Sequence, residues 1–209
     1  MRDSIIILSA FVAGLCLSIF GIVPEDIDLS GISKYILYIL TFSVGLSLGL
    51  DRTLLPTIKS QPVRMLLLPL STMIGTFIGA FAAWVTINAI AIGQQQEIGI
   101  LDALCVSAGF GYYSLSSILL NEARGVELGT MALAANIIRE LMTVVFAPLM
   151  AKLFGKLAPI SSGGATTMDS TLPIIQNAVG NEYVPISIFH GVVVDFSVPL
   201  FLSFFVSLY

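Results

Sequence analysis

Apolar residues fill the chain in runs of about 20, and short polar segments separate these runs. A helix of that length spans the hydrocarbon layer of a bilayer. The pattern therefore predicts an all-α polytopic membrane protein, with residues 1–209 forming a single integral membrane domain. About five full transmembrane helices are expected, at Ser4–Val23, Ser33–Leu50, Val63–Ile92, Gly129–Leu149 and Pro185–Tyr209.

The loop charges predict how these helices are oriented. Three basic residues lie within 51–64, and two lysines lie within 151–157. Cytoplasmic loops carry an excess of Lys and Arg, so both loops are expected in the cytoplasm, with 24–31 and 93–98 outside.

This orientation creates a parity problem between residues 98 and 151. The chain must cross an odd number of times there, and the helix at 129–149 accounts for one crossing. The apolar segment Ile100–Leu120 must then count as zero or two crossings. A re-entrant or broken segment satisfies this requirement, whereas a single straight helix does not.

Two segments have the composition of interrupted helices. Residues 101–120 contain a glycine pair followed by hydroxyl side chains, and residues 161–178 contain "GGATTMDSTLPIIQ" (163–176). Breaks are expected near Gly109–Gly111 and Gly163–Thr167, because glycine weakens a helix interior and hydroxyls can satisfy the freed backbone groups. The alternative for the first segment is tight helix packing through small residues. Its candidate substrate or ion contacts are Gly109, Gly111, Tyr112, Tyr113 and Ser114.

Transporters commonly build a site near the middle of the membrane from pairs of interrupted helices. Irregular backbone at that depth persists only where it is buried in protein or lines water. The two segments are therefore expected to approach each other and to form the binding site.

Asp169 is the strongest candidate for substrate or coupling-ion binding. It lies in the second interrupted segment, beside the hydroxyls of Thr166, Thr167 and Ser170, and no basic residue is near it in sequence. A charge at this depth costs about 2.5–3.5 kcal/mol, so such a carboxylate is expected to bind a cation or carry a proton.

Four further ionisable residues fall inside predicted spans. Arg139 and Glu140 lie midway along one helix, about 100° apart around its axis, and either structural pairing or coupling explains them. His190 and Asp195 lie in the last span and are candidate substrate or ion ligands. The alternatives are that His190 donates to a backbone carbonyl and that Asp195 is a protonated acid in a polar contact.

Composition excludes several classes of function. Hydrophobic residues make up 56% of the chain and charged residues 11%, with a net charge of −4 and no basic stripe for nucleic acid. Neither a nucleotide motif of the form G-x-x-x-x-G-K-[ST] nor a G-x-S-x-G or H-E-x-x-H enzyme motif occurs. The chain is expected to be a secondary transporter and not an enzyme, with no metal or cofactor beyond a coupling H⁺ or Na⁺.

Four ordered stretches resemble the bacterial lysine exporter family, LysO. They are "SAGFGYYSLSSILL" (107–120), "IIRELM" (137–142), "GGATTMDSTLPIIQ" (163–176) and "VPISIFHG" (184–191). The resemblance covers about residues 33–207. It implies a multi-pass inner-membrane protein that exports L-lysine and its analogue thialysine by antiport against a cation. It also implies a fold related to the cation–proton antiporter and anion transporter group.

One difference from the family concerns the N-terminus. Fused members carry an additional membrane segment there, similar to "LTFSVGLSLGLD" (40–51). The chain thus resembles the large half of a split exporter that lacks the N-terminal third. The expected partner is a small, separately encoded N-terminal membrane subunit or a second copy of this chain.

The residue chemistry suits a lysine substrate. Helix N-termini favour the carboxylate, helix C-termini the α-ammonium, and a buried acid such as Asp169 the ε-ammonium. The rings of Phe110, Tyr112 or Tyr113 can hold the cation or the aliphatic stem. The alternatives are a monovalent cation/proton antiporter, an exporter of another basic amino acid, and a membrane subunit that only scaffolds a partner.

Overall fold

A computed structural model describes residues 62–90 and 98–209, together with single positions between residues 13 and 56. The chain divides into two compact units, Met1–Gly45 and Leu46–Tyr209. The predicted spans Ser4–Val23 and Ser33–Leu50 lie largely outside the described residues. The fold below is that of the second unit.

The described part of the second unit is helical and contains no strand, which confirms the all-α prediction. The three long helices correspond to the predicted spans at 63–92, 129–149 and 185–209. In chain order the elements are α4 (Pro62–Ile90), α5 (Ile100–Ser107), α6 (Tyr113–Arg124), α7 (Val126–Phe154), α8 (Ala158–Gly163), the 3₁₀ helix η1 (Gly164–Met168), α9 (Leu172–Val179), the 3₁₀ helix η2 (Asn181–Tyr183) and α10 (Val184–Val206).

The long helices have the dimensions of membrane spans. Helices α4 and α7 contain 29 residues each and α10 contains 23. At about 1.5 Å per residue, all three exceed the roughly 30 Å of a bilayer core. Among the described residues, Met65–Ile90 and Asn181–Val206 are both long and apolar enough to cross a membrane.

Helices α5 and α6 form a re-entrant hairpin, hereafter the first hairpin (100–124). Asp102, near its start, lies 3.8 Å from Arg124 at its end. The Tyr209 hydroxyl donates a hydrogen bond to Asp102, and the Arg124 guanidinium lies 3.3 Å from the centre of the Tyr209 ring. The hairpin therefore enters and leaves at the same end of the bundle. A segment of this shape agrees with the zero crossings that the loop charges predict for residues 100–120.

Residues 158–179 form a second hairpin from α8, η1 and α9. Lys156, just before it, bonds Glu182, just after it, at 3.3 Å. Lys156 Nζ also lies 5.3 Å from the centre of the Tyr183 ring. Because α7 connects the end of the first hairpin to the start of the second, the two hairpins enter from opposite ends of the bundle. Both predicted interruptions are confirmed.

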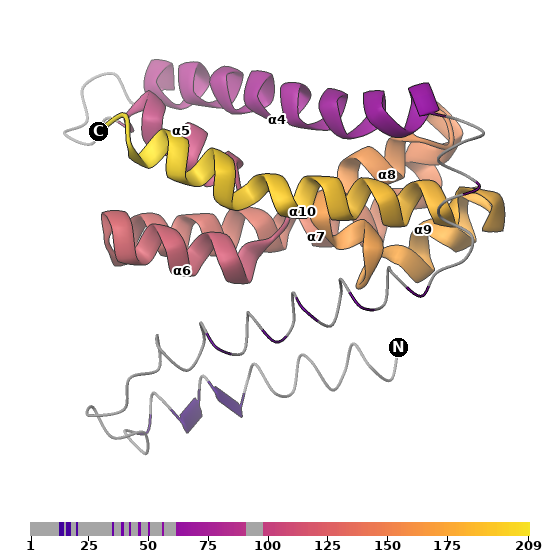
Figure 1. Cartoon of the computed structure of the whole chain (residues 1–209). Coiled ribbons are helices and arrows are strands. Elements are labelled where there is room, and N and C mark those ends of the chain that lie inside the picture. Colours follow the sequence, from indigo (N-terminus) through magenta and orange to yellow (C-terminus); the bar gives the residue numbers. More distant parts are fainter. Residues whose placement is uncertain are drawn as a thin grey trace. The chain divides into compact units, whose positions relative to one another are not determined.

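Helix α10 runs between α4 and α6, α5 packs against α4, and α6 packs along α7 (Figure 1). The order of a hairpin followed by a long helix occurs twice, first as α5–α6–α7 and then as α8–α9–α10. Since these two units run in opposite directions, they have the arrangement of an inverted repeat, which is common among secondary transporters.

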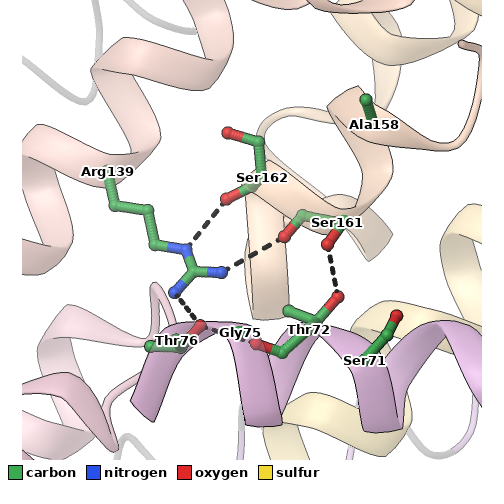
Figure 2. A pocket seen from close by; sticks show the side chains of 8 residues that line it. All are labelled: Ser71, Thr72, Gly75, Thr76, Arg139, Ala158, Ser161 and Ser162. Atoms are coloured by element: carbon green, nitrogen blue, oxygen red, sulfur yellow. Dashed lines mark hydrogen bonds between the residues drawn. The ribbon is translucent and has the colours of Figure 1, made fainter. Parts of the chain in front are cut away.

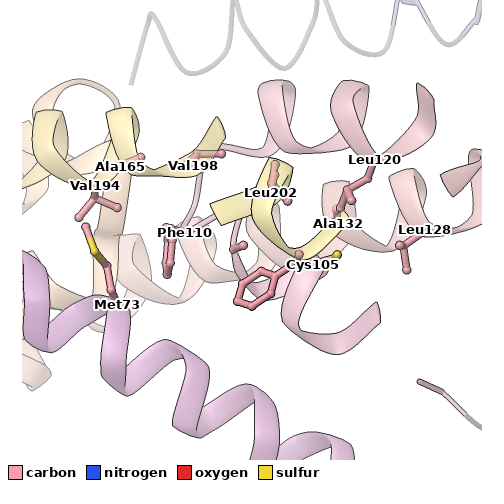
Figure 3. Packing of buried hydrophobic residues seen from close by; sticks show 12 residues of the cluster. Met73, Cys105, Phe110, Leu120, Leu128, Ala132, Ala165, Val194, Val198 and Leu202 are labelled. Atoms are coloured by element: carbon pink, nitrogen blue, oxygen red, sulfur yellow. The ribbon is translucent and has the colours of Figure 1, made fainter. Parts of the chain in front are cut away.

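A buried aromatic cluster fixes the first hairpin within the bundle. The Phe110 side chain has no exposed surface, and its ring packs edge-on against Phe77 of α4 and Phe201 of α10, with centres 5.3 and 5.8 Å apart. Around it, Met73, Cys105, Val194, Val198 and Leu202 complete the core (Figure 3). The hairpin tip is thus packed into the protein interior.

Candidate functional site

The tips of the two hairpins touch each other through their backbones. The Ala165 N–H donates to the Phe110 carbonyl at 3.0 Å. A Cβ on Gly164 would lie 2.0 Å from that carbonyl oxygen, and a Cβ on Gly111 would lie 2.9 Å from the Gly163 carbonyl oxygen. Glycine is therefore required for this close approach. The predicted meeting of the two interrupted segments is confirmed.

An asparagine of α7 braces the tip of the first hairpin. Phe110 and Gly111 adopt positive φ angles of 46° and 97°, which reverse the chain direction. Gly111 donates its N–H to Asn136 Oδ1 at 2.7 Å, and the Asn136 amide donates to the Ala132 carbonyl at 2.8 Å. A backbone group freed by the break is in this way satisfied inside the protein, as the apolar surroundings require.

An arginine of α7 braces the second hairpin. Arg139 Nε donates to the Ser162 carbonyl at 2.8 Å, and Nη2 donates to the Ser161 carbonyl at 3.2 Å (Figure 2). Both carbonyls belong to the last turn of α8, which ends at Gly163. A cation at a helix C-terminus satisfies the unpaired carbonyls and offsets the helix dipole.

One face of α7 supplies these contacts. Asn136, Arg139 and Thr143 are spaced at i, i+3 and i+7, so they share a face of the helix. Thr143 extends the contact, since its hydroxyl lies 2.8 Å from the Ser162 hydroxyl. Glu140 points about 100° away, as its position in sequence predicts.

His190 of α10 joins α4 to the second hairpin. Its Nδ1 lies 3.2 Å from the Thr167 hydroxyl and its Nε2 lies 2.9 Å from the Thr72 hydroxyl. The Thr167 proton faces the Gly164 and Ser187 carbonyls, at 2.8 and 3.0 Å. Thr167 therefore accepts from Nδ1–H. The opposite nitrogen of a neutral ring then accepts from Thr72.

Three carboxylates from three different elements are linked electrostatically through Asp169. Asp169 follows η1, Glu140 lies on α7, and Asp195 lies on α10. Asp169 is close enough to interact electrostatically with both other acids and with the Tyr113 hydroxyl. Ser170 completes this acid cluster, because its hydroxyl bonds the Glu140 carboxylate and its N–H bonds Asp169.

The acid cluster has no basic partner within the described residues. The ion pairs formed there join Arg124 to Asp102 and Lys156 to Glu182, both at the ends of the bundle. Three nearby carboxylates without a counter-ion repel one another, and a bound cation or proton relieves that repulsion. Within the described residues, however, no group of three or more His, Cys, Asp or Glu side chains is placed to hold a metal ion.

Asp169 differs from the sequence expectation in one respect. It was expected to be a buried acid, but its side chain is exposed, whereas Asp195 is 7% exposed. The reason is that η1 ends at Met168, and the backbone then turns so that Asp169 points away from the buried hydroxyls. An exposed carboxylate at a hairpin tip is accessible to a ligand.

A separate pocket of about 450 Å³ lies between α4, α7 and α8. Its volume falls in the range of small-molecule sites. It is lined by Ser71, Thr72, Gly75, Thr76, Arg139, Ala158, Ser161 and Ser162 (Figure 2).

The predicted site residues divide into three groups. Glu140, Asp169, Ser170, Asp195 and Tyr113 meet in the acid cluster. The buried hydroxyls of Thr166 and Thr167 bond the second hairpin internally and, through Thr167, to His190. The first-hairpin residues Gly109, Gly111, Tyr112 and Ser114 form its turn and the start of α6, and Arg139 lies in the pocket. Their roles in binding stay predictions.

Several polar residues that shape the site were not anticipated from the sequence. They are Asn136, Thr143, Thr72, Thr76, Ser161 and Ser162. Asn136 could have been identified from the sequence as a residue with a buried partner, because an unpaired amide in the middle of an apolar helix is costly. The hydroxyls carried little signal, because Ser and Thr are common in membrane helices as helix-packing residues.

The sequence matches the family described as Lysine exporter LysO over residues 8–206. It is 33% identical over 176 residues to "Lysine exporter LysO" of Escherichia coli K12, a match that covers 83% of this chain and 54% of that protein. It is 35% identical over 181 residues to "Putative lysine exporter" of Haemophilus influenzae, covering 85% of this chain and 86% of that protein. The chain thus spans about half the length of the Escherichia coli relative. No solved structure matches it.

Proposed function

The chain belongs to the lysine exporter LysO family, and from this membership we propose that it exports L-lysine from the bacterial cytoplasm by secondary active transport. The proposal places it in the inner membrane as a multi-pass protein. Thialysine is a second expected substrate, because it keeps the charged groups of lysine at nearly the same spacing.

The observation that carries the proposal is the acid cluster at the meeting point of two hairpins. Asp169 interacts electrostatically with Glu140 and Asp195 without a basic partner in the described residues. Because the hairpins enter from opposite ends, each can cover the cluster from one side of the membrane. Two oppositely directed units around one site are common among transporters that work by alternating access, which supports the proposal.

In the proposed cycle, Asp169 binds a substrate ammonium and the coupling cation in turn. The carboxylate releases H⁺ or Na⁺ as the ammonium of lysine enters, and the reverse exchange follows on the other side. Counterflow of the cation supplies the driving force, since one site cannot hold both cations at once. Ser170 orients the carboxylates, and the Tyr113 ring lies beside them.

A monovalent cation/proton antiporter is the second candidate. The acid cluster favours it as well, because ion exchange requires carboxylates but no amino-acid pocket. The two candidates differ in whether proton or sodium flux depends on lysine.

Transport by the purified chain in proteoliposomes tests the proposal. Vesicles loaded with labelled L-lysine should release it when an inward H⁺ or Na⁺ gradient is imposed, and the cation flux should stop when lysine is omitted. Cation flux that is independent of lysine supports the antiporter instead. Competition by L-arginine and L-ornithine measures selectivity among basic amino acids.

The same assay addresses the expected partner. Release by the chain alone, with cross-linking that detects a dimer, supports a second copy of this chain. Release that appears only after a small N-terminal membrane subunit is added supports the split-exporter prediction.

The proposed orientation gives a separate prediction. In a chain whose Cys16 and Cys105 are replaced by Ala, a cysteine introduced as Lys156→Cys should react with an impermeant thiol reagent only after cells are opened. Asn121→Cys, at the other end of the bundle, should react in intact cells. The reason is that basic residues are in excess at the end of the bundle that contains Lys156, and cytoplasmic loops carry such an excess. The opposite labelling pattern contradicts the cytoplasmic placement of residues 151–157.

A further inference from the structure

Arg139 lies in the pocket without an acidic partner among the described residues. The ion pairs found there join other residues. An arginine inside a membrane protein is costly, and it is normally paired with an acid or with backbone carbonyls. Arg139 takes the second arrangement, since it bonds the carbonyls of Ser161 and Ser162 at the end of α8.

These bonds fix the guanidinium and still leave donors available. Nε bonds one carbonyl, Nη2 bonds the other, and Nη1 bonds the Thr76 hydroxyl at 3.1 Å. One N–H on each terminal nitrogen has no partner among the described residues. Held from three directions, the side chain needs no rearrangement before it binds a ligand.

The groups around the two unpaired N–H donors of Arg139 indicate which kind of ligand the pocket can bind. The pocket of about 450 Å³ beside Arg139 is lined by serine and threonine hydroxyls and contains no acid. Ser71 and Gly75 are exposed at its rim, whereas Thr72 is buried at its base. A fixed guanidinium with hydroxyls around it is suited to a carboxylate.

We propose that the Arg139 pocket binds the α-carboxylate of the transported amino acid. The inference rests on the proposed function. It assigns a binding site to the substrate carboxylate, whereas the acid cluster is proposed to bind an ammonium group. Because no acid lines the pocket, the pocket is suited to the carboxylate, which all amino acids share, and not to an ammonium group. Selection for the basic side chain is then made elsewhere, by groups such as the acid cluster.

A purely structural role for Arg139 explains its carbonyl bonds but not the cavity beside it. A cation that only caps α8 works equally well in a tightly packed site, and packing would also lower the cost of the charge. The open space and the two unpaired N–H donors of Arg139 leave room and partners for a ligand of small-molecule size.

Cadaverine, which is lysine without its carboxylate, provides the test. Transport and binding of L-lysine and cadaverine are compared in the wild type, Arg139→Gln and Arg139→Lys. The wild type should prefer lysine by about 10-fold or more, the size of a charge-assisted pair. Arg139→Gln should lose about that preference, measured as the ratio of lysine transport to cadaverine transport, and Arg139→Lys should recover part of it.

A second pair of variants does not disturb the Arg139 bonds. Gly75 lines the pocket, Gly79 lies one turn further along α4 outside it, and a Cβ on either meets no atom within 4 Å. Gly75→Val should raise the KM for lysine by about 10-fold because it fills the pocket, and the matched control Gly79→Val should not. Membrane abundance and thermal unfolding are measured for every variant.

Two results overturn the carboxylate site. One is an equal loss of lysine and cadaverine transport in Arg139→Gln at normal abundance. The other is an equal effect of Gly75→Val and Gly79→Val, which would assign the defect to packing of α4. If the wild type binds lysine through Arg139 but does not transport it, the proposed function fails and the carboxylate site stands. Absence of both binding and transport removes both proposals.

Discussion

Asp169→Asn should abolish lysine export and leave the protein in the membrane at normal abundance. An amide costs less than a carboxylate in a bilayer, so insertion is not impaired. The amide cannot release a proton or neutralise an ammonium, so the exchange proposed for the acid cluster stops. We expect at least about a 100-fold fall in the rate of lysine release, because a charge-assisted contact worth about 3 kcal/mol is lost. Growth of cells challenged with thialysine, with membrane abundance measured alongside, provides the readout.

Glu127→Gln is the matched control for Asp169→Asn. Glu127 is an exposed acid in the first turn of α7, away from the hairpin tips. Its replacement removes the same charge and should leave export within about 2-fold, because exposed charges contribute little. Full thialysine resistance of the Asp169→Asn strain would remove this residue from the mechanism and leave Asp195 and Glu140 as the candidate cation ligands.

Gly164→Ala should separate the hairpin tips and abolish both stability and export. Gly164 has a φ of 63°, and a Cβ there would lie 2.0 Å from the backbone oxygen of Phe110. A backbone oxygen on a packed hairpin cannot move aside as a flexible side chain does. Backbone strain and overpacking together should cost at least about 3 kcal/mol. The measurements are the thermal unfolding temperature in detergent and lysine release from vesicles.

Gly155→Ala is the control that separates backbone strain at a positive φ from the steric clash between the two hairpins. Gly155 has a φ of 91° at the end of α7, but a Cβ there meets no atom within 4 Å. The backbone cost should be about 1–2 kcal/mol, with export retained. Equal destabilisation of the two variants would show that the backbone conformation, and not the contact between the hairpins, explains the requirement for glycine at position 164.

The sequence predicted the interruptions because their chemistry is local. Gly109, Gly111 and Gly164 weaken a helix wherever they occur, and the parity of the loop charges required zero or two crossings in 100–120. The spacing of Arg139 and Glu140 likewise predicted that they face different surroundings. Helix geometry alone determines that separation.

The sequence did not predict the partners of these residues. Asn136 supports the first hairpin, and Thr72 bonds His190 across a separation of 118 residues. Neither pairing leaves a periodic signal, because a long-range hydrogen bond depends on how helices pack and not on the spacing within one helix. The exposure of Asp169 depends on the turn after η1, which composition does not specify.

The sequence by itself determined the helical class, the long apolar helices at α4, α7 and α10, the two breaks and the family. These follow from hydrophobic run length, from glycine in helix interiors and from ordered motifs, all of which are read along the chain. Only the tertiary structure decided that both breaks are re-entrant hairpins from opposite ends, because that depends on contacts such as Asp102 with Arg124 and Lys156 with Glu182. Helix geometry predicted that Arg139 and Glu140 face different surroundings, but only the packing decided what those surroundings are: a pocket beside Arg139, and Asp169 within electrostatic range of Glu140.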